Sequence, residues 1–170
     1  GQAELMKAIS GEVLLPKNCI SIVGTFAGDL RVKHRRALGL RYVPEQRLGE
    51  ATAPEMSLES NTLLTSNLFL AKGFMRNKMI ARFTRSIIEK FHVRCDGPKA
   101  PAERLSGGNL QKFFVGRELL HNPKVMVWNQ PTWGVDAGAA TLIRNALIRQ
   151  KSRGSAILVV SEELDELFEI

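Results

Sequence analysis

The sequence is poor in cysteine: Cys19 and Cys95 are the only two in 170 residues, and there is no CxxC motif. This usage is typical of reduced thiols in a cytosolic protein and argues against a disulfide framework or a zinc site. The three histidines show no metal-binding spacing either, so we expect no metal ligands among them.

Long apolar runs are also missing. The run at 156–160 is among the longest, far below the roughly 20 residues that a membrane-spanning helix requires. The first residues lack a basic stretch followed by an apolar core, so they show no signal peptide. A hydrophobic content of 44% and a charged content of 24% are typical of a soluble globular domain.

Positive charge exceeds negative charge, with 24 Lys and Arg against 17 Asp and Glu and a net charge of +7. Basic residues cluster at 31–36 and 72–90, which is compatible with nucleic acid, phosphate ligands or an anionic membrane surface. The aromatic interleaving of RNA-binding surfaces is absent from the sequence. We therefore expect solvated helix faces and no direct contact with nucleic acid.

The second part of the chain alternates helix and strand patterns, which predicts an α/β fold with a largely parallel sheet. The expected segments there are helix 110–120, strand 125–128, helix 138–150, strand 156–160 and a last helix capped by Ser161. Residues 58–104 predict a small helical insertion with helices at 58–70 and 77–91, the latter capped by Asn77. The segments expected before it are helix 3–9 and strands near 20–23 and 40–43.

The segment "LSGGNLQK" at 105–112 is the most informative one. Ser106 and two glycines, Gly107 and Gly108, directly precede a predicted helix. Glycine lets the backbone approach a ligand closely, and the first turn of a helix offers unpaired N–H groups and partial positive charge. These features together favour phosphate binding. On these letters alone, an ordinary Ser-Gly-Gly loop with a helix cap is an equally good interpretation.

The order of motifs around this segment is more specific. A helix, a turn and an apolar strand follow it, and the strand leads into "NQPTWGVD". The sequence resembles the nucleotide-binding domains of ATP-binding-cassette (ABC) transporters, in which a signature motif precedes the Walker B strand. "YVPEQR" at 42–47 resembles the Q-loop of that family, Asp136 its D-loop and Ser161 its switch position. The resemblance implies a P-loop NTPase-like core at 1–57 and 105–170 with a helical subdomain at 58–104.

The signature variant with Asn109, Gln111 and Lys112 is similar to that of monosaccharide and ribonucleoside importers, which carry two cassettes in one polypeptide. The start "GQAEL" resembles the end of the weakened phosphate loop of their second cassettes, with Gly1 as its last glycine. We therefore expect an N-terminally truncated piece of a second cassette, in which Gly1, Gln2 and Ala3 are the remainder of the phosphate loop.

Six positions depart from the catalytic pattern of the family. The residues found at these positions are Gln2 for the phosphate-binding lysine, Ala3 for a magnesium-binding hydroxyl, Glu45 for the Q-loop glutamine, Asn129 for the magnesium aspartate, Gln130 for the catalytic glutamate and Ser161 for the switch histidine. A neutral amide is a poor partner for a hard dication, and a missing general base costs about 10²–10⁴ in rate. We expect no hydrolysis at this domain's own site.

Cassettes of this family pair head to tail, so each signature closes the nucleotide site of the other. The resemblance thus implies that Ser106, Gly107, Gly108, Asn109 and Gln111 contact ATP and Mg²⁺ held by a partner cassette, expected to be the N-terminal half of the same polypeptide. It also implies transmembrane permease subunits as partners, a position on the cytoplasmic face of the membrane, and a sugar or nucleoside as cargo. Two alternatives stay open: a soluble ABC-type ATPase acting on ribosomes or nucleic acid, and a regulatory module that does not contact ATP.

Overall fold

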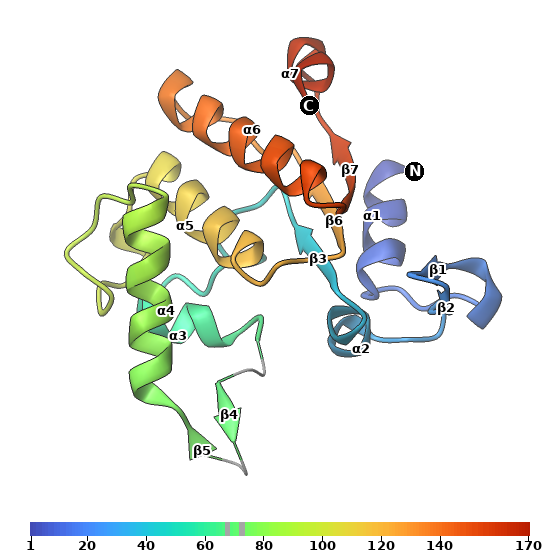
Figure 1. Ribbon diagram of the computed structural model, residues 1–170, viewed down its shortest axis with the longest axis horizontal. Helices are drawn as coiled ribbons and strands as arrows, with labels where there is room; N and C mark the ends of the chain where they lie inside the picture. Colours follow the sequence, from blue (N-terminus) through green and yellow to red (C-terminus); the bar gives the residue numbers. More distant parts are fainter. Residues whose placement is uncertain (67–68, 72–73) are drawn as a thin grey trace.

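The computed structural model describes residues 1–66, 69–71 and 74–170. Its centre is a parallel sheet with the strand order β3-β6-β7, drawn in the middle of Figure 1. The strands are β3 (Leu40–Val43), β6 (Val125–Asn129) and β7 (Ala156–Val160), which agree closely with the predicted strands. In register, Leu40 pairs with Val125, which in turn pairs with Ala156. The predicted parallel α/β sheet is confirmed.

Helices cover both faces of this sheet. Helix α1 (Gln2–Ser10) lies on one side, and α5 (Gly107–Leu119) and α6 (Ala137–Ser152) lie on the other (Figure 1). The side chains of β6 alternate accordingly, as they must on a pleated strand. Met126 and Trp128 are buried in the larger apolar cluster with α5 and α6, whereas Val127 is buried with α1.

The remaining segments before β3 are short. They are a 3-10 turn (Lys17–Cys19), a hairpin of β1 (Ser21–Ile22) and β2 (Thr25–Phe26), and α2 (Val32–Ala37). Arg35 of α2 is fully buried and ties the end of α1 to these segments. Its guanidinium donates to the backbone carbonyls of Ala8, Ile9, Gly28 and Leu30.

The segment at 58–104 combines helices with a small hairpin. Its elements are α3 (Leu58–Leu63), β4 (Leu70–Ala71), β5 (Phe74–Met75), α4 (Asn77–Lys90) and a 3-10 turn (Ala102–Arg104). The helix expected at 58–70 was too long: α3 ends at Leu63, and Leu70 pairs with Met75 in an antiparallel hairpin. Asn67 and Leu68 of that helix, and Lys72 of the expected basic cluster, lie outside the described residues.

Three predicted helix starts need correction. Helix α5 begins at Gly107, so the glycines form its first turn instead of preceding it. Arg76 occupies the cap position of α4, which makes Asn77 its first residue. Helix α7 (Leu164–Glu169) begins after Glu163, and the Ser161 hydroxyl accepts a hydrogen bond from the Glu163 N–H at 3.1 Å. Among the described residues, no helix is long and apolar enough to cross a membrane.

A buried charged cluster anchors α5 to its neighbours. The Arg117 Nε donates to the Glu118 carboxylate at 2.8 Å, and its Nη atoms donate to the carbonyls of Asn61 and Ala51. Arg41 of β3 lies 3.6 Å from the same carboxylate. Burial opposes ionisation of Glu118, but Arg117 and Arg41 outweigh it, and the net effect lowers its pKa. His121 lies nearby, stacked on Phe83 at 5.0 Å.

Candidate nucleotide-binding site

The tip of α5 is an exposed, capped helix start. Ser106 has an extended backbone, and its Oγ accepts hydrogen bonds from the Asn109 Nδ2 at 2.9 Å and the Asn109 N–H at 3.5 Å. Ser106 and Gly107 are exposed to solvent. The first-turn N–H groups of this 13-residue helix therefore face outward, with the partial positive charge that favours anions.

A cavity of about 540 Å³ opens at this tip. Basic and polar groups dominate its lining: His92, Arg94, Ser106, Asn109, Lys112 and Asp136. Lys112 donates to the His92 carbonyl at 2.8 Å, and the Asn109 side chain accepts from the Arg94 N–H at 2.9 Å. The cavity thus combines a helix start, two cationic side chains and the carboxylate of Asp136, and its helix start and cations can bind phosphate.

Asp136 links this tip to α6. Its Oδ1 caps α6 by accepting from the Ala139 N–H at 2.9 Å, and this hydrogen bond is the main cause that lowers the pKa of Asp136. A Cβ placed on Gly108 would lie 3.6 Å from the other carboxylate oxygen. The structure therefore brings Ser106, Gly108 and Asp136 together, although they come from separate motifs of the sequence.

Gln111, which the resemblance also assigns to the nucleotide contact, does not lie on this surface in the folded chain. Only 1% of the residue is exposed. Its Oε1 accepts from the Arg47 Nε at 2.8 Å, and its Nε2 donates to the Pro131 carbonyl at 2.5 Å. Because α5 begins at Gly107, residue 111 lies in the second turn of the helix, and its side chain is on the buried side of α5.

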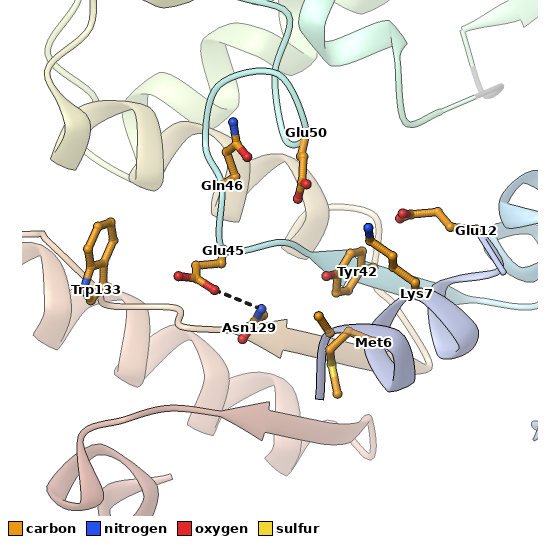
Figure 2. A pocket seen from close by; sticks show the side chains of 10 residues that line it. Met6, Lys7, Glu12, Tyr42, Glu45, Gln46, Glu50, Asn129 and Trp133 are labelled. Atoms are coloured by element: carbon orange, nitrogen blue, oxygen red, sulfur yellow. Dashed lines mark hydrogen bonds between the residues drawn. The ribbon is translucent and has the colours of Figure 1, made fainter. Parts of the chain in front are cut away.

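A second cavity, of about 460 Å³, lies between α1 and the ends of β3 and β6 (Figure 2). It brings together three of the departing positions, Ala3, Glu45 and Asn129. The Asn129 Nδ2 donates to the Glu45 carboxylate at 3.4 Å, which Figure 2 marks with a dashed line. The strand end and the loop after β3 therefore meet at this cavity.

The charge of the second cavity is mainly negative. Glu12, Glu45 and Glu50 line it, and Lys7 is the only cation among the described residues of this lining. Tyr42 also faces it, and burial, helped by these carboxylates, raises the pKa of Tyr42 to about 12. A lining of this kind repels phosphate groups.

The second cavity does not fit a resident magnesium ion. The Ala3 side chain offers no oxygen ligand, and the Asn129 amide donates to the carboxylate of Glu45. The Asn129 Oδ1 is buried and accepts no hydrogen bond within the part of the chain that the structure describes. Magnesium is usually held by one or two carboxylates together with waters and substrate phosphates. In the part of the chain that the structure describes, Glu12, Glu45 and Glu50 of this lining do not form a group that could hold a metal ion.

Gln130 and Ser161 form hydrogen bonds with the backbone of the segment around β7 and α7. The Gln130 Oε1 accepts from the Glu162 N–H at 3.2 Å, and its N–H donates to the Val160 carbonyl at 2.8 Å. Gln130 has a φ of 53°, so the turn after β6 is left-handed at a residue other than glycine. Ser161 bonds to the Glu163 N–H. Gln2 and Gly1 are exposed at the start of α1.

Two site residues were given no role from the sequence. Lys112 follows Gly108 by four residues, so helical spacing could have placed it on the same face of α5. Arg47 bonds to Gln111 across 64 positions, and no local pattern predicts such a contact. Both residues lie beside the tip of α5 in the folded chain.

The comparisons with known proteins agree with this geometry. The chain is 34% identical to the nucleoside import ATP-binding protein NupA of Lactococcus lactis, in an alignment that includes 100% of the chain and 34% of the relative. It is 32% identical to the ribose import ATP-binding protein RbsA of Bacillus subtilis, over 98% of the chain and 34% of the relative. The chain belongs to the ABC transporter cassettes. No protein-family model matches it.

Solved structures support the same fold for this ABC cassette. The dimeric structure of the bacterial cassette MJ0796 matches with a TM-score of 0.80 and 18% identity, over 99% of this chain and 73% of that one. A dimeric post-hydrolysis state of MJ0796 bound to ADP and phosphate matches with a TM-score of 0.79 and 19% identity, over 98% and 72%. The cassette spans about a third of the length of its curated relatives, 34% for NupA.

Proposed function

We propose that this cassette belongs to the ATP-driven part of an importer for nucleosides or sugars, in which it lends the tip of α5 to a partner cassette. The partner holds ATP and Mg²⁺, and Ser106, Gly107 and Gly108 complete that site. The observation that carries the proposal is the contrast between two surfaces. One is a capped helix start with Lys112 and Arg94 beside it, and the other is an acidic cavity.

The tip of α5, with Ser106, Gly107 and Gly108, would stabilise the negative charge that develops on the phosphate during hydrolysis. Backbone N–H groups at a helix start, held in place by a cap, can stabilise phosphate oxygens without rearrangement at the moment of reaction. Donors of this kind are each worth about 10²–10³ in rate. The second cavity would take no part in chemistry, because the strand that ends beside it carries the amides Asn129 and Gln130 where the family resemblance implies carboxylates.

The partners follow from the same proposal. A second cassette, the N-terminal half of the same polypeptide, would face the tip of α5. Permease subunits would contact residues 45–70, at the junction between the core (1–57 and 105–170) and the helical subdomain (58–104). The cassette would then lie on the cytoplasmic face of the membrane. The names of NupA and RbsA motivate nucleosides and sugars as the cargo classes.

The test is Ser106→Arg in the complete transporter. The arginine would place bulk and charge where phosphate should bind, so we expect ATP turnover and transport to fall by about 10²–10³. Ser152→Arg is the matched control, because Ser152 is exposed at the end of α6, away from the tip. Normal turnover in Ser106→Arg would reject the proposal and favour a regulatory module that does not contact ATP.

A further inference from the structure

Arg47 lies where three segments of the cassette meet. Its Nε donates to the side chain of Gln111 on α5 at 2.8 Å, and one Nη donates to the backbone carbonyl of Trp133. The same guanidinium lies over the Trp133 ring, 5.7 Å from its centre. A residue in the loop after β3 is therefore bonded both to α5 and to the turn after β6.

Two glycines lie directly against the guanidinium of Arg47. A Cβ on Gly107 would lie 2.5 Å from the Arg47 Nη1, and a Cβ on Gly134 would lie 3.1 Å from Nη2. Contacts this short would force the guanidinium to move. Gly107 is the first residue of α5, so Arg47 packs directly against the backbone of the tip.

The groups that contact the charged guanidinium of Arg47 are neutral. Within the described residues no carboxylate lies within ion-pair distance, so the guanidinium depends on one amide oxygen, one carbonyl and one ring. Gln111 completes the link by donating to the Pro131 carbonyl. Lysine cannot reproduce this arrangement, because its ammonium lacks the planar fork with donors at fixed angles.

The loop that carries Arg47 also reaches the second cavity. Glu45, two residues earlier, accepts a hydrogen bond from Asn129 there. We propose that Arg47 is a positioning residue that couples this loop, at 44–50, to the tip of α5, so that a shift of the loop changes the placement of Ser106 and Gly107. This inference rests on the proposed function, because it assigns a regulatory input to the lent surface.

The test compares variants of the complete transporter. With Arg47→Lys the tip would lose its support, and we expect kcat for ATP hydrolysis to fall about 10- to 100-fold, as small misplacements near reacting groups do. The KM for ATP should change less than about twofold, because the partner cassette holds the nucleotide. Arg104→Lys is the matched control, since Arg104 is exposed near the tip and has no side-chain hydrogen bond or ion pair in the described chain.

A second variant guards against simple loss of folding. Gln111→Met keeps the volume of the side chain while removing both amide contacts. We expect Gln111→Met to lower kcat as Arg47→Lys does. The double variant should have about the same kcat as the more impaired of the two single variants, because both changes break one link. All rates are normalised to the folded fraction from thermal denaturation. If Arg47→Lys fails to fold, Gln111→Met and its KM against kcat pattern decide.

Two results would overturn the inference. One is an Arg47→Lys enzyme that matches Arg104→Lys in kcat, and the other is a double variant whose defects multiply. These results are distinct from failure of the proposed function, which Ser106→Arg reports. If Ser106→Arg blocks turnover while Arg47→Lys does not lower it, only the coupling role is lost.

Discussion

The side-chain amide of Asn129 donates a hydrogen bond to the carboxylate of Glu45 across 3.4 Å, joining the end of β6 to the loop after β3. This pair places an amide on the strand and a carboxylate on the loop. The usual family arrangement, as the resemblance implies it, has these groups the other way round. The exchange keeps one negative charge at this point of the cavity while removing the carboxylate from the strand.

A carboxylate at position 129 should therefore destabilise the cassette. Asn129→Asp would replace an amide donor by a second negative charge beside Glu45, which like-charge repulsion and the lost hydrogen bond make unfavourable by about 1–3 kcal/mol. Urea denaturation at neutral pH measures the loss. Asn145→Asp, on α6, controls for the change of net charge. Equal stability of the two variants would contradict the role given to the Asn129–Glu45 bond.

The 170-residue cassette alone should not hydrolyse ATP above background. Gln130 is bonded to the Glu162 N–H, Ala3 offers no ligand, and the second cavity is acidic. The measurement is phosphate release with ATP and magnesium. Gln130→Glu should not create activity, because the cation ligands would still be missing. Magnesium-dependent turnover that Gln130→Ala abolishes would show that the prediction is wrong.

Arg35 should be among the most sensitive positions for stability. Its guanidinium is fully buried and donates to four backbone carbonyls around the end of α1. Arg35→Lys would leave some of these buried acceptors without a partner, which we expect to lower the free energy of unfolding by about 2–4 kcal/mol. Arg31→Lys, at an exposed position, is the control. A loss below 0.5 kcal/mol, a typical surface value, would contradict this account.

His121 should make stability depend on pH. Burial, with the nearby Arg41, lowers the pKa of His121 from 6.5 to about 4. The unfolded chain therefore binds more protons between these values, so stability is fully present above about pH 6.5 and falls as the pH drops toward 4. His121→Phe keeps a ring against Phe83 and should flatten this part of the stability curve. A stability curve that His121→Phe leaves unchanged would exclude His121 as the cause.

Local patterns in the sequence were enough for the sheet and for the presence of a helix after Ser106, although not for its first residue. The apolar runs of β6 and β7 and the Ser-Gly-Gly start of α5 depend on neighbouring residues, so they could be predicted. The β4–β5 hairpin could not, because a pairing of Leu70 with Met75 overrode a helical pattern. The partner of Gln111 could not be predicted either, because Arg47, which donates a hydrogen bond to its side chain, is remote in sequence.

The strand order of the sheet has a consequence for biosynthesis. Strand β6 is central, yet it is paired on one edge with β3, which is made long before it, and on the other with β7, which is made after it. On the ribosome, the β6-facing edge of β3 stays without its native neighbour while the whole of 58–104 emerges. Open strand edges invite aggregation, so chaperones that shield nascent chains should matter most during that interval.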